Sequence, residues 1–143
     1  MIAQRTLSRD ELLITESDFD RLKHLVDSPR YRVTHAMLTA TLRAGLKRSR
    51  VVGAASVPDG VVTMNSKVRV RDLKSGESET YTLVFPDDAD INDGRLSVLA
   101  PLGAALLGAR AGDVVEFAAP AGVRRLKVEK VLYQPEAAGD FHL

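Results

Sequence analysis

The chain reads Ser97-Val98-Leu99-Ala100-Pro101-Leu102-Gly103-Ala104-Ala105-Leu106-Leu107-Gly108, and shortly afterwards Ala111-Gly112-Asp113-Val114-Val115. The apolar run 96–99 predicts a short strand. Pro101 suits the first turn of a helix, so a short helix is expected over 102–109. The Gly-Asp pair of the second segment predicts a turn into a strand over 114–117. A strand, a helix and a strand so close together predict an α+β body in which one short helix packs on a sheet.

Alternating side chains on both sides of this segment complete the predicted sheet. Further strands are expected over 67–71, 81–85 and 123–133. In the first of these, valines alternate with cations, which is typical of a half-buried strand. In the last, the apolar residues change phase, which predicts a β-bulge near Lys130. An acidic loop is expected over 87–94. The pattern therefore predicts a mostly antiparallel sheet.

The N-terminal part of the chain has a helical period instead. Thr15 followed by Asp18 resembles a capping box, and Pro29 disfavours a helical conformation at the residue before it, so a helix is expected over 16–27. Leucines spaced by four predict a second helix over 33–50. Two amphipathic helices with a short connection predict an antiparallel hairpin, a short coiled coil. We therefore expect a helical hairpin over 1–52 with a loose lead-in over 1–13, a linker over 53–60 and the α+β body over 61–143.

The composition is that of an ordinary globular protein. Of the 143 residues, 45% are hydrophobic and 27% are charged, and the absence of cysteine excludes disulfides and thiol chemistry. No segment approaches the ~20 apolar residues of a membrane span and no signal peptide is evident, so we expect a cytoplasmic protein without a membrane partner. Residues 1–50 carry ten Lys/Arg and six Asp/Glu, whereas residues 51–143 carry ten and thirteen. A basic arm thus precedes a mildly acidic body.

No group of residues in the sequence suggests an active site. The histidines, His24, His35 and His142, have no partners at metal-ligand spacing. The acidic loop lacks the glutamate that a calcium loop carries at its twelfth position, because that residue is Val98. We therefore expect no catalytic residue, no metal and no cofactor, and a protein that is not an enzyme.

The segments quoted above resemble the C-terminal domain of the bacterial transcription factors GreA and GreB. In that family a strand is followed by S/A-P-x-G-x-A-L-L-G, then x-G-D-x-V, then P-x-G, which is Pro120-Ala121-Gly122 here. The similarity spans about 61–133 and implies an FKBP-like fold. Two further segments are similar to the Rnk branch, the regulators of nucleoside diphosphate kinase: Val61-Val62-Thr63-Met64-Asn65-Ser66 and Tyr133-Gln134-Pro135-Glu136-Ala137-Ala138-Gly139-Asp140.

The resemblance implies that RNA polymerase is the partner. Gre factors dock their globular domain at the rim of the polymerase secondary channel. The docking segment corresponds here to Ala100, Pro101, Leu102 and Gly103, with alanine in place of the usual serine. A Leu102→Asp variant is therefore expected to stay folded and to lose polymerase binding. The family name also implies an effect on nucleoside diphosphate kinase level or nucleotide pools, most simply through transcription.

The tip of the helical hairpin departs from the family pattern. Paired acids at the coiled-coil tip of Gre factors help to hold a catalytic Mg²⁺ for transcript cleavage. The corresponding residues here are Asp27, Ser28, Pro29 and Arg30, which include a single acid. A twelve-residue helix also reaches only ~18 Å. We therefore expect a channel factor that competes with other factors without stimulating cleavage.

The residues leave two other functions open. The FKBP-like fold suggests a peptidyl-prolyl isomerase, although 5% aromatic residues and no tryptophan count against a proline pocket. The second function is direct DNA binding through cations on one side of the sheet. The alternative is that these cations are only solvated. That side would comprise Lys67, Arg69, Arg71, Arg124, Arg125 and Lys127. Residues 134–143 are expected to be ordered because apolar anchors recur in them, and the sequence carries no signal for an oligomeric state.

Overall fold

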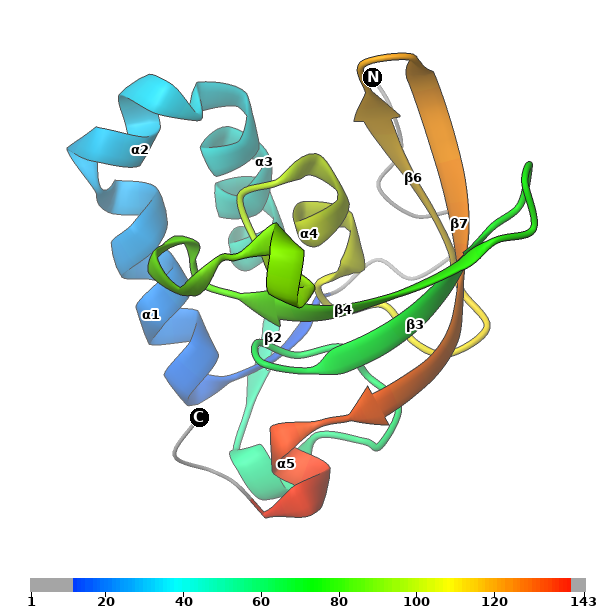
Figure 1. Ribbon diagram of the computed structural model, residues 1–143. Helices are drawn as coiled ribbons and strands as arrows, with labels where there is room; N and C mark the ends of the chain where they lie inside the picture. Colours follow the sequence, from blue (N-terminus) through cyan, green and yellow to red (C-terminus); the bar gives the residue numbers. More distant parts are fainter. Residues whose placement is uncertain (1–11, 140–143) are drawn as a thin grey trace.

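The computed structural model describes residues 12–139. The expected lead-in therefore lies almost entirely outside the described residues, as does the end of the C-terminal segment from residue 140. The chain has an α+β architecture, with the helices of its N-terminal part on one side of a curved sheet (Figure 1). No helix within residues 12–139 is long and apolar enough to cross a membrane.

Five strands form the main sheet in the order β5-β4-β3-β7-β6. They are β3 (Lys67–Asp72), β4 (Ser78–Val84), β5 (Arg95–Ser97), β6 (Val114–Ala119) and β7 (Gly122–Tyr133). The pairs are antiparallel except β4 with β5, which run parallel. The register between β3 and β7 skips Leu132 and Glu129, so the bulge predicted near Lys130 is confirmed. β4 lies earlier than expected because the β3–β4 turn is short and Pro86 already starts a 3₁₀ turn.

The N-terminal part holds three helices rather than two. They are α1 (Glu16–Asp27), α2 (Pro29–Thr34) and α3 (Ala36–Lys47). The predicted bounds of α1 are confirmed, and the Thr15 side chain accepts a hydrogen bond from the backbone N–H of Asp18 at 3.1 Å. The prediction of a single second helix over 33–50 is wrong. Pro29 opens α2 because proline fits the first helical turn, and His35, with φ −134° and ψ 47°, separates α2 from α3.

A small two-stranded sheet that the sequence did not predict closes the base of the helices. β1 (Leu13–Thr15) and β2 (Arg50–Val52) pair in parallel. Leu12, which precedes β1, accepts the backbone N–H of Arg50 at 2.8 Å. α1 and α3 lie side by side with α2 joining them, as Figure 1 shows. Helices of twelve residues joined by a third helix leave the expected coiled-coil hairpin unconfirmed.

One hydrophobic core extends from the helices into the sheet. Leu22 and Leu42 of the helices belong to the same buried cluster as Leu83 and Leu126 of the sheet. The short helix α4 (Pro101–Leu106) packs on β6, and η1 (Ala54–Ser56) lies within the expected linker. α5 (Pro135–Ala138) follows β7, so the first part of the C-terminal segment is ordered as expected. The division into a hairpin, a linker and a body stays a prediction, as does the FKBP-like comparison.

The linker is held against the body by buried contacts. Val57 is buried, and the side-chain amide of Gln134 donates to the carbonyl oxygens of Pro58 and Val61 at 2.9 and 2.8 Å. Gln134 lies next to α5, so the C-terminal segment fixes the start of the body. The two remaining 3₁₀ turns, η2 (Pro86–Asp88) and η3 (Ile91–Asp93), lie in the acidic loop.

Candidate functional site

The expected docking segment has only two accessible residues. Pro101 is exposed and Ala100 is partly exposed, whereas Leu102 and Gly103 are buried. A Cβ atom added at Gly103 would collide with the backbone carbonyl oxygen of Ser97. The expectation that Leu102→Asp would leave the fold intact is therefore wrong, because a carboxylate would replace a side chain that is 6% exposed in the core.

The segment is shaped by the turn that precedes α4. The hydroxyl of Ser97 accepts the backbone N–H of Leu99 at 3.0 Å, and the carbonyl oxygen of Ser97 accepts the N–H of Ala100 at the same distance. Ala100 caps α4 without a side-chain hydrogen bond. A partner would therefore meet Pro101 on a preformed turn.

The expected tip residues mark the junction between α1 and α2. The carboxylate of Asp27 accepts from Arg43 at 2.7 Å and lies 3.6 Å from the ammonium group of Lys23. The hydrogen bond from Arg43 is the main reason that the pKa of Asp27 is lowered. Arg43 also donates to the carbonyl oxygen of Val26 at 2.7 Å. The single acid of the tip is thus already paired with two cations.

The remaining tip residues turn the chain into α2. Ser28 caps α2 without a side-chain hydrogen bond, and Pro29 occupies its first turn. The guanidinium of Arg30 lies over the ring of Tyr31, 5.2 Å from its centroid. Farther out, Val33 and Met37 are 82% and 81% exposed. Sequence reasoning missed these two residues because it placed them inside one long helix.

A buried polar network joins α1 to the body at the Val61–Ser66 segment. Asp18 is 1% exposed; its carboxylate accepts from Arg21 at 2.8 Å and from the backbone N–H of Met64 at 3.2 Å. Burial is the largest effect on this carboxyl and raises its pKa to about 6, against the opposing charge of Arg21. Sequence reasoning assigned Asp18 only to the helix cap, because its tertiary partner is far along the chain.

The Val61–Ser66 segment is one of the two motifs that are similar to the Rnk branch, and its residues form a tight turn. Asn65 adopts a left-handed conformation with φ 68°, which asparagine tolerates better than most residues. The Ser66 hydroxyl accepts the backbone N–H of Thr63 at 2.9 Å, closing the turn. The Thr63 hydroxyl donates to Glu136 at 2.6 Å. The motif and the C-terminal segment are therefore in contact and have a structural role.

Some of the residues considered for the alternative functions are already engaged by neighbouring side chains. Arg124 pairs with Asp72 at 2.8 Å, and Arg125 lies 3.3 Å from Glu116. Guanidinium groups cover one face of Phe85 and of Phe117, which gives no support to a proline pocket. Within residues 12–139, no group of three or more His, Asp or Glu side chains could hold a metal ion.

Comparisons with known proteins define the class. The family model for the C-terminal domain of the transcription elongation factors GreA and GreB matches residues 57–133. The structure of a prokaryotic transcription elongation factor GreA/GreB from Nitrosomonas europaea has a TM-score of 0.72 at 38% identity. The match covers 86% of this chain and 100% of that one. The chain therefore belongs to the GreA/GreB family and is a Gre-like transcription factor.

A relative that matches over nearly the whole chain indicates the branch of the family. The chain is 41% identical over 138 residues to the regulator of nucleoside diphosphate kinase of Escherichia coli, which covers 96% of this chain and 100% of that protein. Transcription elongation factor GreA of Hyphomonas neptunium is 36% identical over 89 residues, 62% of this chain and 57% of that protein. The similarity to the Rnk branch that the motifs predicted is confirmed.

Proposed function

We propose that the protein binds RNA polymerase at its secondary channel and regulates transcription there without acting as an enzyme. Its membership of the GreA/GreB family supports the partner, and its relatives named above are a regulator and elongation factors. The proposal that the protein does not stimulate transcript cleavage rests on the carboxylate of Asp27, which is already paired with cations. A channel factor of this kind blocks the entrance to other factors.

The tip residues 27–30 contain one carboxylate, that of Asp27, and it is already paired with cations. Catalytic magnesium takes hard oxygen donors, and a cation bound to the same carboxylate competes with it. Asp27 is held by Arg43 and Lys23, and no second acid lies between residues 28 and 58. Arg30 and Arg32 add positive charge nearby, which opposes the approach of a divalent ion.

The wild-type protein should not stimulate transcript cleavage by backtracked RNA polymerase. Arg43→Ala frees one oxygen of Asp27 but adds no second ligand, so this variant should also be inactive. A cleavage-active GreA added to the same stalled complexes is the positive control, and excess wild-type protein should slow its cleavage. Rapid cleavage by the wild-type protein that disappears in Asp27→Ala would refute the proposal.

Pro101→Glu should weaken binding to core RNA polymerase by at least about tenfold, the ratio that corresponds to 1.4 kcal/mol. Pro101 is the exposed residue of the docking segment, and glutamate is compatible with the first turn of a helix. Pro120→Glu, in the β6–β7 turn, makes the same chemical change elsewhere and should bind like wild type. Binding is measured by titration of labelled protein with polymerase.

The same pair of variants tests the link to nucleoside diphosphate kinase. We propose that any effect on the level of that kinase follows from polymerase binding, so Pro101→Glu should lose it and Pro120→Glu should keep it. If Pro101→Glu keeps wild-type polymerase affinity, docking through the 100–101 turn is wrong.

A further inference from the structure

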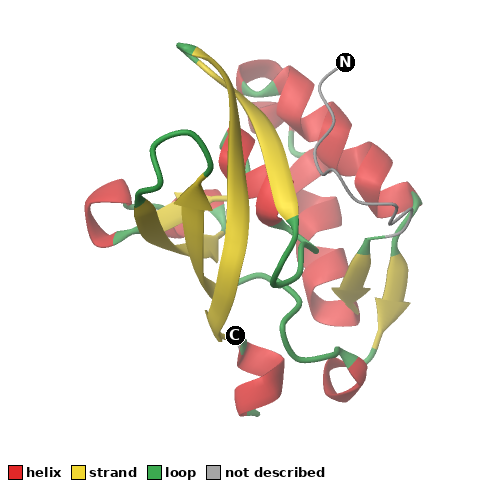
Figure 2. Cartoon of the chain, turned by 90° about the vertical axis from the view of Figure 1, so that its right-hand side faces the viewer, coloured by secondary structure: helices red, strands yellow, loops and turns green. Residues whose placement is uncertain are grey.

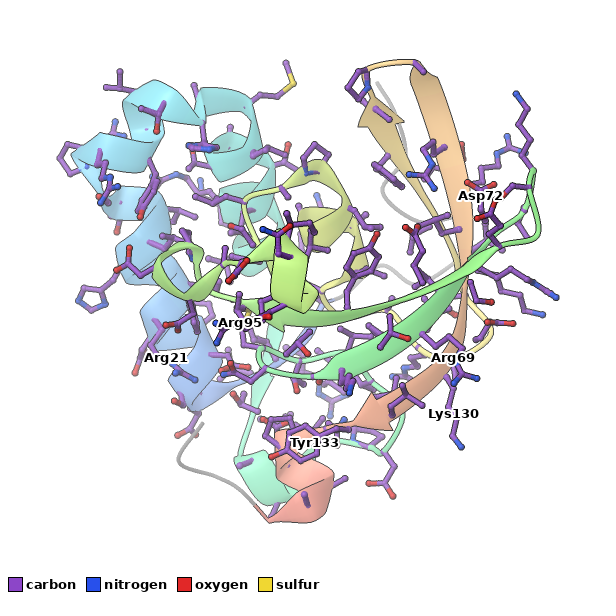
Figure 3. The ribbon with its side chains drawn as sticks, viewed as in Figure 1. Arg21, Arg69, Asp72, Arg95, Lys130 and Tyr133 are labelled. Atoms are coloured by element: carbon purple, nitrogen blue, oxygen red, sulfur yellow. The ribbon has the colours of Figure 1, made fainter. Side chains whose placement is uncertain are left out.

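The face of the main sheet that points away from α4 carries cations on both of its central strands. On β3, Lys67, Arg69 and Arg71 are exposed while the valines between them are buried. The register places Lys130 of β7 directly opposite Arg69, and Lys127 opposite Arg71. Figure 3 shows Arg69 and Lys130 pointing away from the helices. Seen from that side, the helices of the N-terminal part lie behind the strands (Figure 2).

These cross-strand pairs are unfavourable in the free protein. Directly opposite side chains in a sheet lie about 5 Å apart at Cβ, and like charges in such pairs are destabilising. Here two such pairs, Arg69 with Lys130 and Arg71 with Lys127, lie next to each other. An anion that binds across these pairs would reduce the repulsion between their positive charges.

Few carboxylates on the described strands offset this charge. Glu129, the bulge residue, lies 3.7 Å from Arg71 and accepts from the hydroxyl of Ser78 at 2.8 Å. Asp72 and Glu79 pair instead with Arg124. Within residues 12–139, Lys67, Arg69, Lys127 and Lys130 form no ion pair. The face defined by Lys67, Arg69, Arg71, Lys127 and Lys130 is called the basic sheet face below.

The neighbouring groups favour a nucleic-acid strand over an acidic protein. Thr80 and Thr82 of β4 lie opposite Arg69 and Lys67, and hydroxyls bind phosphate oxygens. Protein interfaces have an apolar centre. Of the exposed large apolar side chains on or next to β3 and β7, Leu132 lies near Lys67 and Lys130, whereas Leu73 and Val123 lie at the other end of these strands. A flexible strand can also follow the curvature of the sheet.

We propose that the basic sheet face binds the phosphate backbone of single-stranded nucleic acid. The cations along β3 are spaced by ~6.8 Å, twice the rise per residue, so they contact successive parts of one strand. Contacts to phosphates read no base sequence, so affinity depends on charge and salt. The inference is independent of polymerase docking, because the residues involved differ from Ala100 and Pro101.

Binding of a labelled 20-nucleotide single-stranded RNA, followed by fluorescence anisotropy against salt, tests the proposal. With five cations engaged, the logarithm of affinity should fall with the logarithm of salt at a slope of about −3.5, or −0.7 per phosphate contact. Lys130→Glu and Arg69→Glu should each weaken binding at least about tenfold and reduce the slope. Single-stranded DNA of the same sequence should bind within a few-fold of RNA, and duplex DNA more weakly.

A stability readout separates loss of binding from loss of fold. Because Lys130→Glu turns a repulsive pair with Arg69 into an attractive one, the free variant should melt at the same temperature as wild type or higher. Lys47→Glu on α3 makes the same charge change on an exposed helix residue and should leave RNA binding within twofold. Lys130→Glu should also leave polymerase affinity unchanged.

Three results would overturn the proposal. If Lys130→Glu and Arg69→Glu bind RNA with wild-type affinity, the basic sheet face is not the RNA-binding site. Equal weakening by Lys47→Glu would mean that binding is spread over the whole surface. Loss of polymerase binding with RNA binding retained would make the face a protein-docking surface instead.

Discussion

Gly103→Ala should lower the free energy of unfolding by about 1–3 kcal/mol, the usual cost of overpacking a core. Gly103 lies in α4, and an added Cβ would collide with the carbonyl oxygen of Ser97, a backbone atom that cannot rotate away. Helix α4 would have to move off the β5 end, which would displace Pro101 with it. Thermal and urea unfolding measure the effect, and Tm should fall by several degrees.

Gly53→Ala is the matched control for this prediction. Gly53 has φ −68°, and an added Cβ would meet nothing within 4 Å. The substitution should therefore be neutral or slightly stabilising, because alanine restricts the unfolded chain. If Gly103→Ala is as stable as Gly53→Ala, α4 is not packed against Ser97 as described.

Asp18 should make the stability of the protein decrease as pH rises from about 4 to 6. Burial raises its pKa from 3.8 in the unfolded chain to about 6 in the folded protein. Between these values the folded state retains a proton that the unfolded state has lost, so raising the pH favours unfolding. A pKa difference of about two units changes the free energy of unfolding by about 3 kcal/mol. This stability is fully present below pH 4 and is lost as the pH rises above the folded-state pKa of Asp18.

The measurement compares urea unfolding of wild type and Asp18→Asn between pH 4 and 7.5. The lowered pKa values of Asp27 and Asp72 act in the opposite direction, so the difference between the two proteins is the quantity of interest. The advantage of wild type over the variant should shrink as pH rises. Asp20→Asn, an exposed residue of the same helix, should run parallel to wild type. Parallel profiles for Asp18→Asn would disprove the assignment.

The local features of the chain were predictable from the sequence. The Thr15 cap, the end of α1 before Pro29, the half-buried strand β3 and the bulge near Lys130 all follow from spacing within a few residues. Motifs in the second half also predicted the family, since they combine several residue types at fixed spacing. These features depend on backbone sterics and on which side chains alternate, and both are written in the sequence.

The arrangement of distant residues was decided by the tertiary structure. β1 and β2 are three residues each and are stable only because they pair with each other, so neither has a pattern of its own. Leu102 was expected to be a docking residue, but α4 turns it into the core. The hydrogen bonds of Asp18 with Met64 and of Thr63 with Glu136 form only after the chain has folded. The same holds for the position of Arg69 opposite Lys130. Burial and cross-strand register depend on contacts between segments far apart in the chain, and neither has a local periodicity.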